Sequence, residues 1–143
     1  MLVSQILKGK NSQNIISVGP NDGILMAAGL LSKNRIGALV VFDTKGMLIG
    51  IISERDIVKE VGIKGNQALN LLVKDLMSKK VITCSTTETA FDVLNKMTQG
   101  RFRHIPVMED QKMLGLISIG DVVKARLGEL NMEKQALEEY IGH

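Results

Sequence analysis

Two short stretches of the sequence repeat the same arrangement of a serine and an aspartate. They are GIISERD, residues 50–56, and GLISIGD, residues 115–121. In each, an aliphatic run typical of a strand leads into a serine and, three residues later, an aspartate, which predicts the start of a helix. The free amides at such a helix start can bind an anion, while the serine can contact a sugar or phosphate and the carboxylate can accept from ribose hydroxyls. The pattern therefore indicates a nucleotide-binding cradle.

A purely structural interpretation of the same residues stays open. Serine followed three residues later by an acidic residue is also a capping box, in which Ser53 and Asp56, or Ser118 and Asp121, satisfy the backbone of the helix start. Aspartate also suits the positive end of the helix dipole. One copy alone is explained adequately in this way.

The elements that position these residues form a repeat. Residues 14–43 overlay residues 80–109 with a shift of 66, and the shift becomes 65 after the following turn. Each copy predicts a strand, a helix, a hairpin of two strands and a second helix. The expected first strands are IISV, residues 15–18, and VITC, residues 81–84.

The ends of the first helix of each copy are predicted from residue types. Asn21 or Thr87 is expected to cap its start, and the helices are expected to stop near Asn34 and Gly100, which tolerate a left-handed conformation.

The expected fold class is α/β (α+β), with two tandem β-α-β-β-α repeats packed sheet to sheet with pseudo-two-fold symmetry. One copy is about 55 residues long, which makes a separate core marginal and favours burying the two sheets against each other. We expect a first repeat with its N-terminal segment at 1–66, a second repeat at 67–126 and a C-terminal helix extension at 127–143.

On these motifs the chain resembles a stand-alone pair of CBS domains, a Bateman module. The signature of glycine, aliphatic residues, serine and aspartate is present twice, and RFRHIPV, residues 101–107, is similar to the family's basic-aliphatic-proline-valine strand. The signature residues are Gly50, Ser53 and Asp56, and again Gly115, Ser118 and Asp121.

The resemblance implies a set of ligand-binding residues for an adenosine-containing molecule. Asp56 and Asp121 would bind the ribose. The residues implied near the ribose or phosphate are Ser53, Ser118, Arg55, Arg103 and His104. The residues implied around the adenine are Ile16, Ala38, Leu39, Ile82, Ile105 and Pro106. The expected ligand is AMP first, with ADP, ATP, NAD(H) and S-adenosylmethionine as further possibilities that the sequence does not separate.

The two copies are not equivalent, and several residues keep an alternative role. Gly37 and Ala38 stand where the second copy has Arg103 and His104, so the two sites are not expected to bind phosphate equally. Arg55 is explained equally by a solvated position at the helix start, and His104 by a partly exposed strand position.

Composition excludes several functional classes. A formal charge of +3 with three Phe, one Tyr and no Trp does not indicate nucleic-acid binding, and one Cys with two His offers too few ligands for a metal centre. No run approaches the roughly 20 apolar residues of a membrane helix, and the opening residues lack the features of a secretory leader. We expect a cytoplasmic protein with no membrane association. Cys84, the single cysteine, is expected to be a buried, inert thiol.

The tail from residue 120 predicts one long helix with an imperfect apolar stripe of Val123, Leu127, Leu130, Leu137 and Ile141. We expect this helix to take part in a homodimer, with the edge of a monomer core as the alternative. No pairing of nucleophile, acid or base at convincing spacing predicts catalysis, so the first hypothesis is a non-catalytic nucleotide sensor that signals to an unknown protein target by conformational change. A constitutive homodimeric scaffold with vestigial sites is the alternative, and a nucleotide-processing enzyme is a third.

Overall fold

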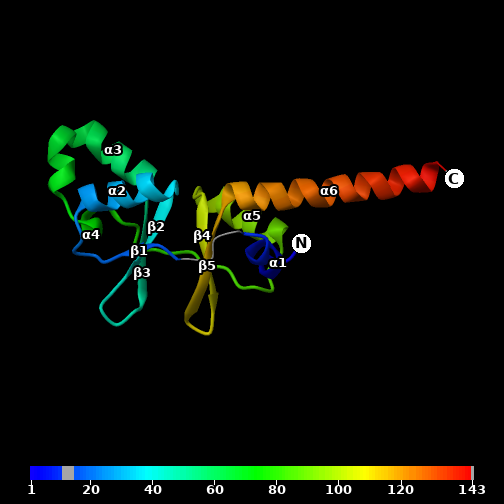
Figure 1. Ribbon diagram of the computed structural model, residues 1–143, viewed down its shortest axis with the longest axis horizontal. Coiled ribbons are helices and arrows are strands. Elements are labelled where there is room, and N and C mark those ends of the chain that lie inside the picture. Colours follow the sequence, from blue (N-terminus) through cyan, green and yellow to red (C-terminus); the bar gives the residue numbers. More distant parts are fainter. Residues whose placement is uncertain (11–14, 143) are drawn as a thin grey trace. The chain divides into compact units, whose positions relative to one another are not determined.

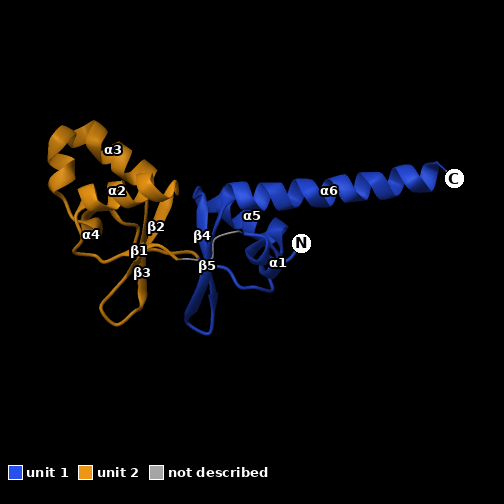
Figure 2. Ribbon diagram, viewed as in Figure 1, with its two compact units in different colours: residues 1–14, 83–143 blue, residues 15–82 orange. Residues whose placement is uncertain are grey.

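The computed structural model describes residues 1–10 and 15–142, and the chain divides into two compact units (Figure 2). One unit is continuous and comprises Ile15–Ile82. The other combines Met1–Asn14 with Thr83–His143. Each unit contains one small sheet and its own helices, which confirms the mixed helix and strand class.

The continuous unit contains a three-stranded sheet with the order β1-β2-β3 (Figure 1). β1 pairs in parallel with β2, and β2 pairs antiparallel with β3. Four of the five residues of β2 are buried, as is typical of a central strand between two neighbours. The elements in chain order are β1(Ser17–Val18), α2(Ile24–Asn34), β2(Ala38–Phe42), β3(Leu48–Ser53), α3(Glu54–Lys64), the 3-10 turn Gly65–Asn70 and α4(Val73–Leu76).

The core of this unit joins its sheet to its helices. Ile24, Ala27 and Leu31 recur at helical spacing on α2 and are buried against β2 and β3. The cluster of buried residues is Val18, Ile24, Ala27, Leu31, Leu39, Val41, Ile52, Ile57 and Val73.

The discontinuous unit contains the two-stranded antiparallel sheet β4-β5. Ile105, Val107 and Ile117 are fully buried in this sheet, and Ala90, Val93 and Met97 are the buried residues of α5. The elements are α1(Val3–Lys8), α5(Ala90–Gly100), β4(His104–Glu109), β5(Lys112–Ser118) and α6(Ile119–Ile141).

The strand expected at residues 81–84 is reduced to one parallel bridge, between Cys84 and Val107. The Cys84 amide donates to the Pro106 carbonyl at 3.0 Å, and the Met108 amide donates to the Cys84 carbonyl at 2.9 Å. A further rung of this parallel ladder would need Pro106 to donate toward Ile82, and proline has no amide hydrogen. In the other unit the equivalent position is Val40, and β1 forms there.

Each unit contains a short helix that precedes the other repeat in the sequence. α1 lies in the unit of the second repeat, where Val3 donates to the Glu88 carbonyl at 2.9 Å and Ala90 donates to the Met1 carbonyl at 2.8 Å. α4 lies in the unit of the first repeat. There the Val73 amide donates to the Asp22 carbonyl at 2.8 Å, and the Ile24 amide donates to the Leu71 carbonyl at 2.9 Å. The backbone bonds that hold α1 in one unit and α4 in the other therefore join equivalent residues of the two repeats.

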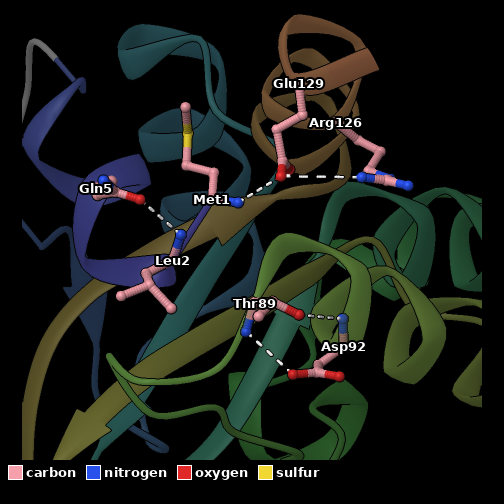
Figure 3. Close-up of polar contacts among 7 residues, drawn as sticks. All are labelled: Met1, Leu2, Gln5, Thr89, Asp92, Arg126 and Glu129. Atoms are coloured by element: carbon pink, nitrogen blue, oxygen red, sulfur yellow. Dashed lines mark hydrogen bonds and ion pairs between the residues drawn. The ribbon is translucent and has the colours of Figure 1, made fainter. Parts of the chain in front are cut away.

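Side-chain contacts hold the start of α1 in place (Figure 3). The amine of Met1 lies 2.6 Å from Glu129 Oε2 on α6, and the Leu2 amide donates to Gln5 Oε1 at 2.8 Å. Leu2 also forms an isolated bridge with Thr89, the N-cap of α5. Val3 and Ile6 are buried, so α1 is part of the core of its unit.

α2 and α5 end at Asn34 and Gly100, as expected, but the left-handed residues and the N-caps lie at other positions. The left-handed residues are Arg35 and Arg101, with φ of 53° and 56°, one position after Asn34 and Gly100. The caps of the helix starts are Gly23 and Thr89, not Asn21 and Thr87. Thr89 is favoured because its hydroxyl accepts from the Asp92 amide while Asp92 accepts from the Thr89 amide, a complete capping box.

Candidate functional site

The first Ser/Asp pair lies where β3 runs directly into α3. Ser53 is the N-cap: its Oγ accepts from the Asp56 amide at 3.3 Å, and its own amide donates to Asp56 Oδ2 at 2.8 Å. The Ser53 hydroxyl also donates to Asp56 Oδ2, at 3.0 Å. The capping box is therefore present here, and both hydrogen bonds to the Asp56 carboxylate end on the same oxygen, Oδ2.

The second pair, where β5 runs into α6, adds a charged partner. Ser118 Oγ accepts from the Asp121 amide at 3.1 Å, and the Ser118 amide donates to Asp121 Oδ2 at 2.9 Å. Lys10 Nζ also donates to Asp121 Oδ2, at 2.8 Å, and to the Leu116 carbonyl at 2.7 Å. Lys10 is thus a charged donor to Asp121 that has no counterpart on Asp56 among the ion pairs of the described residues.

These contacts change the acidity of Asp121. Partial burial favours the protonated acid and acts to raise the pKa of Asp121. The hydrogen bond and positive charge of Lys10, together with the Ser118 amide, favour the carboxylate and outweigh burial. The pKa of Asp121 is therefore held below its ordinary value, and Asp121 is ionised at neutral pH.

The first amides of both helices are largely satisfied by the protein itself. The Glu54 amide donates to the Gly37 carbonyl at 2.9 Å, and the Ile119 amide donates to the Arg103 carbonyl at 2.8 Å. The third amide of each helix bonds the capping serine. Among the bonds found in the described part of the chain, the second amide, at Arg55 or Gly120, is the one left for a ligand. The carboxylates are thus the main polar feature of each junction.

The glycines that open the two motifs have a packing role. A Cβ on Gly50 would lie 2.5 Å from Met77 Sδ and 3.1 Å from the Ser78 carbonyl oxygen. A Cβ on Gly115 would lie 2.8 Å from Leu7 Cδ2. Leu7 belongs to α1 and Met77 follows α4, so each glycine makes room for the segment that precedes the other repeat.

The family model described as "CBS domain" matches residues 3–63 and 73–128, more than half of the sequence. The chain belongs to the CBS-domain family. Its two repeats are therefore tandem CBS repeats, as the motifs predicted.

Solved structures of CBS-domain proteins resemble the chain over most of its length. The CBS-domain containing protein ATU1752 from Agrobacterium tumefaciens is 43% identical, with a TM-score of 0.83, covering 87% of this chain and 92% of that one. The CBS domain pair of protein MJ0100, in complex with 5′-methylthioadenosine and S-adenosyl-L-methionine, is 28% identical, with a TM-score of 0.78, covering 90% and 98%. The CBS domain protein PAE2072 from Pyrobaculum aerophilum, complexed with AMP, is 25% identical, with a TM-score of 0.74, covering 85% and 89%.

The sheets of the two CBS repeats bring several predicted residues to the Ser/Asp pairs. Ala38 pairs with Ser53 across β2 and β3, and His104 pairs with Ser118 across β4 and β5. The apolar residues predicted around adenine in these strands are buried, which leaves backbone groups as their polar features. These residues are Ala38, Leu39, Ile105 and Pro106.

The other predicted adenine positions are less closely placed. Ile16 is partly buried and immediately precedes β1. Ile82 lies outside the strands, at the end of the continuous unit, whereas Ile105 and Pro106 lie in the other unit. Because Pro106 has no amide hydrogen to donate toward Ile82, no ladder joins Ile82 to β4.

The basic residues of the motifs differ in placement. Arg55 is exposed in the first turn of α3, and Arg103 is exposed just before β4. His104 is partly buried at the first position of β4. The exposure of Arg55 agrees with the solvated alternative and leaves its guanidinium available to an anion.

Cys84 is buried, as expected. Burial, followed by the nearby charge of Glu88, raises the pKa of the Cys84 thiol to about 12, and the charge of Lys96 acts in the opposite direction. The thiolate is the reactive form, so Cys84 is poorly suited to redox or nucleophilic chemistry.

The residue that the sequence analysis missed is Lys10. A signal for it exists in a second internal match, LVSQILKGK at residues 2–10 with LVKDLMSKK at residues 72–80, at a shift of 70. This match places Lys10 opposite Lys80 and Leu7 opposite Met77. The shift of 70 differs from the 66 and 65 of the main repeat, so an overlay of the main repeat does not align these two segments.

Residues 1–10 and 15–142 contain neither a metal-binding cluster nor a membrane-spanning helix. No group of three or more His, Cys, Asp or Glu side chains there is arranged to hold a metal ion. No helix within the same ranges combines the length and apolar character needed to cross a membrane.

Proposed function

We propose that this protein is a non-catalytic regulatory module that binds adenosine-containing ligands, with Asp56 and Asp121 receiving the ribose. The observation that carries the proposal is the twofold occurrence of an aspartate at a strand-to-helix junction whose Oδ2 is engaged by the cap. In each case Oδ1 has no bond among the contacts found, so it is free to accept from a ribose hydroxyl.

Relatives with bound ligands support the adenosine class. PAE2072 was solved with AMP and the MJ0100 pair with 5′-methylthioadenosine and S-adenosyl-L-methionine. The group common to these molecules is adenine joined to a ribose ring with its 2′- and 3′-hydroxyls. We propose AMP as the first ligand to test, with ADP, ATP, NAD(H) and S-adenosylmethionine as the other members of the panel.

The remaining predicted residues extend the proposed sites. Ser53 and Ser118 would contact the ribose or phosphate, and Arg55, Arg103 and His104 would contact phosphate. Backbone groups around the residues predicted near adenine would read the base. Those residues are Ile16, Ala38, Leu39, Ile82, Ile105 and Pro106.

Calorimetric titration of nucleotide-stripped protein with this panel tests the proposal. We expect micromolar binding that weakens at least tenfold at one site in Asp56→Asn and at the other in Asp121→Asn. Asp92→Asn is the matched control, because Asp92 has the same capping-box position in α5 without a strand-to-helix motif. Equal losses in all three variants would indicate a general effect of losing a cap, and no binding by the unmodified protein would refute the proposal.

A constitutive homodimeric scaffold is the second candidate, and the exposed apolar surface of α6 supports the dimer that it requires. Leu127, Leu130 and Leu137 are 61%, 45% and 62% exposed. We propose that α6 packs in a homodimer in either case. The scaffold differs from the sensor in that its dimer would be unaffected by every nucleotide of the panel.

The proposal also includes the repeat boundaries and the location of the protein. We keep 1–66 and 67–126 as the sequence repeats, with 127–143 as the extension of the final helix. We propose a cytoplasmic location, where the single thiol would remain reduced; cell fractionation with an antibody to the protein tests it.

A further inference from the structure

The two proposed ribose carboxylates differ in one partner. Asp56 Oδ2 accepts from the Ser53 hydroxyl at 3.0 Å, whereas Asp121 Oδ2 accepts from Lys10 Nζ at 2.8 Å. Lys10 is anchored further by the Leu116 carbonyl at 2.7 Å. Its side chain and that of Asp121 are 30% and 27% exposed.

These two partners are not equally easy to replace. A serine hydroxyl is neutral and rotates about one bond, so a ribose hydroxyl can take its place at little cost. A bond between an ammonium and a carboxylate is charge-assisted and stronger, and partial burial reduces its screening by water. A ribose that uses both oxygens of Asp121 must compete with Lys10.

The equivalent lysine of the first repeat shows no such contact. By the shift of 70, Lys80 corresponds to Lys10, and Lys80 is exposed. The ion pairs found in the described part of the chain include Lys10 with Asp121 but none between Lys80 and Asp56. The asymmetry is thus specific to the second repeat and is supplied by the segment after α1.

We propose that Lys10 is an internal competitor for the ribose carboxylate Asp121, which makes the second repeat the weaker site and lets the Asp56 site fill first. The inference rests on the proposed function, since it concerns the same carboxylates. It assigns Lys10 a selective role: an uncharged ribose-bearing ligand that uses both carboxylate oxygens must displace an ammonium at the Asp121 site, whereas the Asp56 carboxylate has no such charged partner.

The test uses adenosine, which carries no phosphate that could bind Lys10 directly. Each site is read separately, the Asp121 site in an Asp56→Asn background and the Asp56 site in an Asp121→Asn background. Lys10→Met removes the charge and keeps the length of the side chain. We expect it to tighten adenosine binding at the Asp121 site by about tenfold, the value of a modest charged hydrogen bond, and to leave the Asp56 site unchanged.

Two control variants separate competition from structural effects. Lys10→Arg keeps the charge and is expected to retain the weak binding of the unmodified protein. Lys80→Met removes the corresponding exposed lysine and is expected to change neither site. Lys10→Gln gives a second uncharged variant if Lys10→Met disturbs the fold in thermal melts.

The possible outcomes distinguish this inference from the proposed function. Weaker or unchanged binding at the Asp121 site in both uncharged variants overturns the competition. So does an Asp121 site that binds no adenosine in any variant while the Asp56 site still binds, although the proposed function then survives. Absence of nucleotide binding at both sites overturns the two proposals together.

Discussion

At Asp121, burial acts to raise the pKa of the carboxyl group, and the hydrogen bonds of Lys10 and Ser118 together with the charge of Lys10 outweigh it. Asp56 has the same backbone surroundings without that cation. The structure thus offers a matched pair of aspartates in one chain.

Asp121 is expected to stabilise the fold at neutral pH and to stop doing so in acid. Its pKa is lower in the folded protein than in the unfolded chain, where an aspartate titrates near about 3.9. The stabilisation is therefore fully present above the unfolded value and is lost as the pH falls through the lower, folded value. Urea unfolding between pH 2 and 7 should show a smaller acid-dependent loss in Asp121→Asn than in the unmodified protein. Parallel curves for the two proteins would contradict this expectation.

Cys84 is expected to resist thiol reagents in the folded state. Its pKa of about 12 leaves almost no thiolate at pH 8, and burial blocks access. Alkylation followed by mass spectrometry should be slow in buffer and fast in denaturant. Rapid modification of the folded protein, at the rate of a free thiol, would show that Cys84 is accessible.

At the level of elements, the two motif glycines are the points where a helix-bearing segment meets a strand. Gly50→Ala is expected to destabilise the protein by about 1–3 kcal/mol, because the new methyl group meets both Met77 and the backbone oxygen of Ser78. Gly115→Ala should cost less, since it meets the flexible end of Leu7. Denaturant unfolding measures both.

The control for these substitutions is Gly29→Ala, within α2. A Cβ at Gly29 meets nothing within 4 Å, so alanine is expected to be neutral or to stabilise by about 0.5–1 kcal/mol through helix propensity. A similar loss of stability in Gly29→Ala and Gly50→Ala would mean that crowding at β3 is not the cause.

The elements of the repeat were predictable because local patterns define them. The hairpins and the starts of α3 and α6 follow from alternating apolar residues and from the serines at 53 and 118, which act within a few residues. The reduced strand at Cys84 was not predicted, because it depends on the missing amide of Pro106, a residue 22 positions away.

The site was predicted only in part for the same reason. Ser53, Asp56, Ser118 and Asp121 were found because each pair lies within one turn of helix. Lys10 was missed because its contact with Asp121 spans 111 positions in the sequence. A motif read along the chain does not reveal which remote segment returns to it.

At the level of the whole molecule, the exposed apolar residues of α6 predict self-association. We expect Leu127→Ser combined with Leu137→Ser to convert a dimer to a monomer, because both side chains are more than half exposed and serine removes their apolar area. Light scattering coupled to size-exclusion chromatography measures the mass.

Two further measurements complete this test. Val122→Ser serves as a contrast, because Val122 is fully buried in the first part of the same helix and its loss should lower stability instead of mass. An unchanged dimer in the variant that combines Leu127→Ser and Leu137→Ser would exclude the outer part of α6 from the interface.

The exchange of short helices between the repeats also has a consequence for synthesis of the chain. The unit Ile15–Ile82 is complete once its own residues have left the ribosome, whereas α1 precedes that unit and meets its partners Glu88, Ala90 and α6 only after it. At 5–20 residues per second, the wait from residue 10 to residue 130 is about 6–24 s. During that interval Val3 and Ile6, which the finished fold buries, have no native core to join. α1 is thus among the last of these elements to reach its final place.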